Sequence, residues 1–153
     1  MVLVMVGTQK QQFLRIFNMV ENSKVLENEE IIAQIGHTKF QSNKIKCFEF
    51  IENEKLQQYI KDAELIICHA GVGTIFEALH QNKKVIAVPR LAEFKEHVDN
   101  HQLEICEALE KEGYILVCKK DDDFDEIVKK SKNYEFKKYQ KDESYLEILK
   151  NEI

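Results

Sequence analysis

The sequence is poor in residues that break or cross-link a chain. Its 153 residues include one proline, five glycines and no tryptophan, and they contain no glycine- or serine-rich linker and no repeat. No apolar run approaches the roughly 20 residues that span a bilayer. The apolar start over residues 1–7 lacks a basic flank and is too short for a signal peptide. These absences predict one packed domain of a cytoplasmic protein.

Basic residues are fewer than acidic ones. Lysine and arginine number 22 against 27 acidic residues, for a formal net charge of −5. A domain that binds phosphate backbones needs a basic face. We therefore expect no nucleic-acid partner.

The cysteines show no C-x-x-C pair. Cys47, Cys68 and Cys118 lie in apolar runs, and Cys106 lies in a stretch with helical spacing. This scatter predicts buried, reduced thiols that act as small apolar side chains.

Six short apolar runs predict β-strands. Most are nearly continuous in apolar residues, which is typical of strands covered on both faces. The runs are Val2–Val6, Ile31–Ile35, Ile45–Phe50, Leu65–Cys68, Val85–Val88 and Ile115–Cys118. Stretches with helical spacing separate them, except between Gly36 and Lys44, where the connection is too polar and short for a good helix. The alternation predicts an α/β fold, a Rossmann-like parallel sheet with helices on both faces.

From Lys119 onward the composition changes to dense charge of both signs. An acidic run over residues 121–125 precedes a lysine-rich helix, a pattern typical of a solvated face. We divide the chain into a domain over residues 1–130 and a charged helical tail over residues 131–153. The tail ends in an apolar stripe that either packs on the sheet or docks a partner; it consists of Tyr145, Leu146, Ile148 and Leu149.

Two loops are predicted to lie where a ligand would bind. In an open parallel sheet, ligands bind at the carboxyl ends of the strands, where the strand order reverses. Residues 7–9 follow the first strand and residues 69–74 follow the fourth. Gly71 and Gly73 either serve a tight turn or let a ligand approach the backbone. A helix starting near Thr74 would point its free N–H groups at this gap and suit a diphosphate.

Glu77 has two interpretations. Thr74 and Glu77 fit a capping box, in which the glutamate folds back to the helix start. One turn into the helix, the same carboxylate can instead accept bonds from two ribose hydroxyls. Both interpretations predict a helix here.

A third polar segment follows the fifth strand. Pro89 and Arg90 begin it, and residues 96–102 open the next helix. The side chains of Asn100, His101 and Gln102 are of the type that binds sugar hydroxyls, although helix capping by Asp99 or Asn100 explains part of the pattern equally well.

Motifs for other chemistry are missing. His97 and His101 have the spacing of two metal ligands on a helix, but a helix that starts near Asp99 leaves His97 outside it. The sequence has no H-E-x-x-H, no G-x-S-x-G and no phosphate-binding G-x-x-x-x-G-K-[ST] loop. We expect no metal and no cofactor.

Five motifs, in this order over roughly residues 1–118, resemble glycosyltransferase family 28. They are Val6-Gly7-Thr8-Gln9 with Phe13 and Arg15, Gln34-Ile35-Gly36, His69-Ala70-Gly71-Val72-Gly73-Thr74 with Glu77, Pro89-Arg90, and Glu96-His97 with Asn100-His101-Gln102. More narrowly, the chain is similar to the small catalytic subunit of split bacterial exopolysaccharide or capsule glycosyltransferases. That subunit is similar to the cytosolic part of the eukaryotic split UDP-GlcNAc transferase.

The resemblance implies the nucleotide-sugar-binding half of a GT-B enzyme, with a membrane-anchored partner chain as the acceptor-binding half. It implies that residues 71–74 hold the diphosphate, Glu77 the ribose, and residues 100–102 the donor sugar, while residues 7–9 line the cleft. The residues expected to bind the nucleotide sugar are Gly7, Thr8, Gln9, Gly71, Val72, Gly73, Thr74, Glu77, Arg90, Asn100, His101 and Gln102. Cys106 departs from the peptidoglycan-type member, which has an asparagine there.

The implied reaction is an inverting transfer from a UDP-sugar to a lipid-linked saccharide acceptor, at the inner face of the membrane through the partner. A helix N-terminus and hydroxyl donors, rather than a divalent metal, would stabilise the departing UDP. The general base is unassigned. His69 and His97 are candidates on reach alone, and the partner chain is another source.

Two alternatives remain open. The chain could bind a nucleotide sugar without catalysing transfer, with the chemistry in its partner. It could also be an unrelated Rossmann-like dehydrogenase or epimerase domain. That last class needs G-x-G-x-x-G after the first strand and an acid ending the second, and Gly7-Thr8-Gln9 and Gly36 supply neither.

Overall fold

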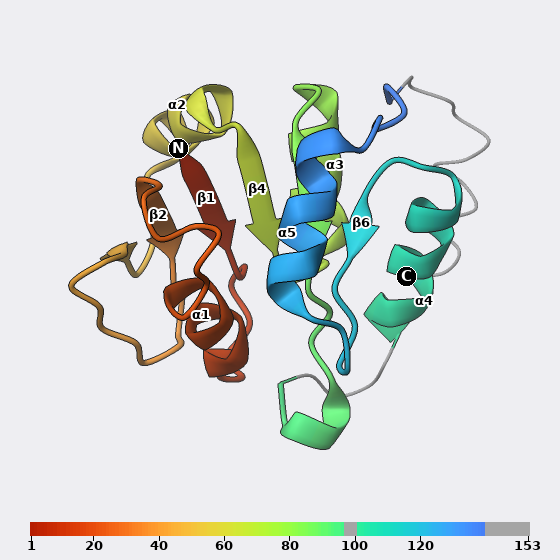
Figure 1. Ribbon diagram of the computed structural model, residues 1–153. Helices are drawn as coiled ribbons and strands as arrows, with labels where there is room; N and C mark the ends of the chain where they lie inside the picture. The colour runs from red at the N-terminus through yellow and green to blue at the C-terminus, as the bar shows by residue number, and fades with distance from the viewer. Residues whose placement is uncertain (97–100, 140–153) are drawn as a thin grey trace.

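Six parallel strands form one sheet in the order β3-β2-β1-β4-β5-β6 (Figure 1). The computed structural model describes residues 1–96 and 101–139, with only the backbone at 101 and 102. The strands are β1 (Val2–Met5), β2 (Ile31–Gln34), β3 (Lys46–Phe48), β4 (Leu65–Cys68), β5 (Lys84–Ala87) and β6 (Leu116–Val117). Each strand coincides with a predicted run, so the predicted sheet is confirmed. Strand order reverses between β1 and β4, which pair with each other.

Helices cover both faces of the sheet (Figure 1). They are α1 (Leu14–Glu21), α2 (Asn53–Asp62), α3 (Val72–His80), α4 (His101–Lys111), α5 (Phe124–Asn133) and a short 3-10 helix, η1 (Ala92–Phe94). Alternate strand residues separate two cores: Leu3 packs with residues of α2, α3 and α4, whereas Val4 packs with residues of α1 and α5. The connection from Gly36 to Lys44 contains no helix, as expected.

The thiols are reduced, and most are shielded from solvent. Cys68, Cys106 and Cys118 are buried and Cys47 is half-buried on edge strand β3. Burial raises the pKa of Cys68 to about 12 and that of Cys118 to about 11. At neutral pH both are protonated and therefore poor nucleophiles. The prediction of buried thiols is confirmed for three of the four.

The end of the described chain stays against the core. Helix α5 begins where the Asp123 side chain accepts bonds from the amides of residues 125 and 126, and it continues past the boundary drawn at residue 130. Tyr139 is buried, and its ring lies 5.3 Å from that of Phe76 and 5.8 Å from that of Tyr114. The apolar stripe of residues 145–149 lies outside the described residues. Among those described, none of the helices has the length and apolar character needed to cross a membrane.

Candidate functional site

The loops after β1 and β4 leave the sheet side by side. Met5 is the register partner of Cys68, and the His69 amide donates to the Met5 carbonyl over 3.1 Å. The arrowheads of β1 and β4 in Figure 1 therefore end at the same edge. The structure brings residues 7–9 and 69–74 together where the strand order reverses, which is where such sheets bind ligands.

His69 occupies the space between these loops. Its side chain is buried, and a Cβ added to Gly7 would lie 2.7 Å from the His69 Cε1. A Cβ on Gly71 would overlap the same ring. Both glycines therefore make room for the imidazole. Gly73 differs, because a Cβ there would meet nothing within 4 Å, so this position leaves open space for a ligand.

Helix α3 begins earlier than predicted. It starts at Val72 rather than near Thr74, and its N-cap is Gly71, which supplies no side-chain hydrogen bond. Gly71 has a φ of −69°, and the left-handed residue in this turn is Ala70, at 72°. Gly71 therefore does not use the left-handed conformation that glycine permits. The amides of residues 72–74 form the first helical turn, have no acceptor within the helix and lie at its positive end.

Glu77 does not close a capping box. Thr74 lies inside the helix rather than at its N-cap, so the capping interpretation is wrong. The Glu77 carboxylate instead accepts a hydrogen bond from the Gln57 amide of α2. Gln57 accepts in turn from the Gln81 amide over 3.1 Å. No sequence motif indicated this contact between α2 and α3.

Arg90, one of the residues expected to bind the nucleotide sugar, is a buried brace in this structure. It has no exposed surface, and its guanidinium donates to the carbonyls of Val6, Gln11 and Glu96 over 2.8–3.0 Å. The ring of Phe13 lies 4.9 Å below it. Burial lowers the pKa of Arg90 to about 10, which leaves it charged at neutral pH. The arginine therefore fixes both ends of the loop over residues 7–9 through its hydrogen bonds to Val6 and Gln11.

A second arginine completes this brace, in a role that the sequence did not predict. Arg15 of α1 forms two hydrogen bonds to the buried Glu96 carboxylate, at 2.9 and 3.1 Å, and one to the Pro89 carbonyl. The Leu91 amide also donates to Glu96. A bidentate arginine–carboxylate pair has fixed geometry. Helix α1 and the segment after β5 are therefore held together.

The structure describes the remaining predicted residues to different extents. Thr8 is exposed, and Gln9 is half-buried, with an Oε1 that is buried and unpaired among the residues described. His97 and Asn100 lie outside the described residues. His101 and Gln102 begin α4, and only their backbone is described. The predicted sugar contacts of residues 100–102 therefore stay predictions.

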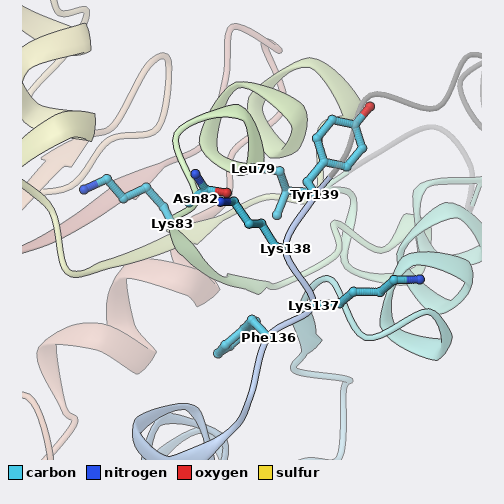
Figure 2. Close-up of a pocket in the computed structure, with 7 residues that line it drawn as sticks. All are labelled: Leu79, Asn82, Lys83, Phe136, Lys137, Lys138 and Tyr139. Carbon is cyan, nitrogen blue, oxygen red and sulfur yellow. The ribbon is translucent and has the colours of Figure 1, made fainter.

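Two hollows lie at opposite edges of the sheet. A groove of about 790 Å³ at the carboxyl edge is lined by Ile35, Gly36, His37, Thr38, Lys39, Phe40, Gln41, Glu49 and Phe50. A pocket of about 350 Å³ at the amino edge is lined by Leu79, Asn82, Lys83, Phe136, Lys137, Lys138 and Tyr139. Figure 2 shows the ammonium ends of Lys83 and Lys137 pointing in opposite directions, so these charges do not converge on a ligand. In the described part of the chain, none of the His, Cys, Asp and Glu side chains form a cluster able to hold a metal.

This architecture is that of the C-terminal domains of GT-B glycosyltransferases. The calicheamicin glycosyltransferase CalG4 superimposes on 99% of this chain with a TM-score of 0.64 and 15% sequence identity, over 36% of its own length. An identity this low shows the fold alone. This match confirms the predicted fold, which is that of one half of a GT-B enzyme.

Sequence comparison gives the family. Residues 1–151 match the model of the glycosyltransferase family 28 C-terminal domain, and the chain belongs to that family. It is 30% identical over 108 residues to the UDP-N-acetylglucosamine transferase subunit ALG13 of Candida albicans, covering 70% of this chain and 34% of that protein.

A bacterial relative matches more of the chain. The UDP-N-acetylglucosamine--N-acetylmuramyl-(pentapeptide) pyrophosphoryl-undecaprenol N-acetylglucosamine transferase of Clostridium tetani is 28% identical over 147 residues, covering 92% of this chain and 36% of that protein. The chain thus spans about a third of each of these two relatives. Membership of the family excludes the unrelated dehydrogenase or epimerase domain.

Proposed function

We propose that this chain is the nucleotide-sugar-binding subunit of an inverting glycosyltransferase that moves a sugar from a UDP-sugar to a lipid-linked acceptor. The start of α3 at the reversal of strand order is the observation that carries the proposal. The names of the two relatives support it: both are N-acetylglucosamine transferases, and the clostridial name specifies an undecaprenol-linked substrate.

The diphosphate would lie against the amides of Val72, Gly73 and Thr74. Exposed Gly73 leaves room for it, and the helix dipole favours its negative charge. The same amides would stabilise the charge that develops on UDP as it departs. Glu77 would accept hydrogen bonds from the ribose hydroxyls, and residues 100–102 would contact the sugar. No divalent metal and no cofactor is part of this proposal.

A second chain would supply the acceptor half. The clostridial relative is nearly three times as long as the part that this chain matches. We propose a membrane-anchored partner that holds this chain at the inner face of the membrane, and exopolysaccharide or capsule synthesis as the pathway. The general base would come from His69, His97 or that partner. His69 is buried between two glycines, so it would act only on a group inserted between the loops.

Calorimetry with UDP tests the site. The wild-type chain is expected to bind UDP, and Gly73→Asp is expected to weaken binding about tenfold or more, because its carboxylate repels the diphosphate at short range. The matched control is Gly73→Asn, which has the same shape without the charge and should retain most of the affinity. Thermal unfolding should show no loss of stability in either variant, since the position is exposed and has open space. Absence of UDP binding by the wild-type chain, alone and with its partner, would overturn the proposal.

Transfer assays separate a catalytic subunit from a binding subunit. The chain, its partner and their mixture are each incubated with labelled UDP-sugars and a lipid-linked acceptor. We expect transfer by the mixture alone, with loss of transfer in the Gly73→Asp variant. Transfer by the partner alone would instead favour a non-catalytic role for this chain.

A further inference from the structure

Glu77 is held from the side by a short chain of amides. The Gln57 amide nitrogen donates to Glu77 Oε1, and the Gln81 amide nitrogen donates to Gln57 Oε1. Glu77 and Gln81 lie one helical turn apart, on the same face of α3. The Gln57 side chain of α2 reaches across to both.

The chemistry of the three groups fixes the direction of these bonds. An ionised carboxylate only accepts hydrogen bonds, so Gln57 must turn its NH₂ toward Glu77. The carbonyl oxygen of Gln57 then faces Gln81, which must donate in its turn. Neither amide can be reversed without losing a bond. This chain of two hydrogen bonds therefore has one stable arrangement, in which the Gln57 amide donates to a single oxygen of Glu77.

This arrangement leaves the other carboxylate oxygen for a ligand. Glu77 Oε2 accepts no hydrogen bond from the residues that the structure describes. Helices α2 and α3 both begin at the carboxyl edge of the sheet, and both Gln57 and Glu77 follow the helix start by little more than one turn. A free glutamate loses substantial side-chain entropy when it is ordered. A carboxylate that is already held avoids much of that loss on binding.

We infer that Gln57 is a positioning residue for nucleoside recognition: it orients the Glu77 carboxylate toward the ribose hydroxyls of the bound nucleotide, and Gln81 supports it. This inference rests on the proposed function and adds a residue of α2 to its binding site. Gln57 does not touch the ligand. Its removal therefore changes how well the protein distinguishes ribose from deoxyribose, more than it changes phosphate binding.

The test is the ratio of the dissociation constants for 2′-deoxy-UDP and UDP, measured by calorimetry on the 153-residue chain. The wild-type chain should bind UDP more tightly. In Gln57→Leu the ratio should fall about two- to tenfold, the equivalent of one hydrogen bond. Gln57→Glu removes the amide donor and adds a carboxylate that repels Glu77, so the ratio should fall in the same direction and overall UDP affinity should fall as well, whereas Gln81→Leu should have a smaller effect. A loss of folded protein alters the apparent number of sites and leaves the ratio unchanged.

Gln58→Leu is the matched control. Gln58 is the exposed neighbour on α2, and its amide donates to Asp62 at the far end of the same helix, so its removal should leave the ratio at the wild-type value. An unchanged ratio in both Gln57 variants, or a wild-type chain that binds the two nucleotides equally, would overturn the inference while UDP binding still supports the proposed function. A wild-type chain that fails to bind UDP would overturn both.

Discussion

The two edges of the sheet differ in how their backbone is shaped. At the amino edge, the left-handed residues Asn82 and Gly113 follow the ends of α3 and α4, where a left-handed residue commonly terminates a helix. The other described residues with positive φ lie in the loops at the carboxyl edge: Gly7, Gly36, Ala70 and Lys95. Strained backbone conformations in the loops that follow strands cluster at functional sites.

The edges also differ in how they are braced. At the carboxyl edge, the buried Arg90 joins segments that are up to 84 residues apart. At the amino edge, Lys83 donates to the carbonyls of Lys61 and Ala63 at the end of α2. The pocket in Figure 2 lies beside the amino edge, whereas the larger groove lies at the carboxyl edge. Backbone shape and long-range bracing therefore distinguish the carboxyl edge from the amino edge.

Removing the carboxyl-edge brace should have the largest effect. Arg90→Met leaves three carbonyls, two of them buried, without their arginine donor, and it removes both hydrogen bonds to the loop over residues 7–10. We expect a loss of about 3–5 kcal/mol in the free energy of unfolding, measured with urea, together with weaker UDP binding. Arg90→Lys should recover only part of the loss, because an ammonium cannot reproduce the planar fork. A stability equal to that of the wild type would show that the brace is dispensable.

Two neighbouring glycines offer a sharper comparison within the carboxyl edge. Gly71→Ala drives a methyl group into the His69 ring and should lower the free energy of unfolding by about 1–3 kcal/mol. Gly73→Ala adds the same methyl group in open space within the first turn of α3, and should match or exceed the wild-type stability. Urea unfolding of both variants measures the difference. Equal losses of stability in the two variants would mean that contact with the His69 ring does not explain the glycine at position 71.

The smallest effect is expected at the amino edge. Lys83→Met removes the donor to two carbonyls at the end of α2 and should lower the free energy of unfolding by about 1 kcal/mol, since the site is partly exposed. UDP affinity should stay at the wild-type value, because this side chain lies across the sheet from the proposed site. A loss of affinity larger than the loss of folded protein would contradict the division between the two edges.

Local patterns in the sequence predicted the sheet and the loops at its carboxyl edge. Continuous apolar runs such as residues 65–68 are typical of strands covered on both faces, and they define β4 in the structure. The polar connection after Gly36 correctly indicated that β2 and β3 are joined without a helix. Helix boundaries were harder to predict, because Gly71 caps α3 without any side-chain signal.

Roles that depend on distant partners were not predictable. Arg90 follows a strand near the proposed site, which is equally compatible with a ligand contact and with a brace. The carbonyls that decide between these roles belong to Val6, Gln11 and Glu96, and only the fold brings two of them near. Gln57 lies in a polar helix with no motif around it. Its role follows from the packing of α2 against α3, which the sequence pattern does not specify.

Ala70 limits which residues its position accepts. The residue adopts a left-handed backbone conformation, and its methyl group is fully enclosed in the core beneath the turn. A larger side chain has no space there, and a β-branched one would also resist the backbone angle. Glycine would relieve the torsional strain but would leave a methyl-sized void. The turn therefore tolerates only the two smallest amino acids, so any redesign of this loop must begin at other positions.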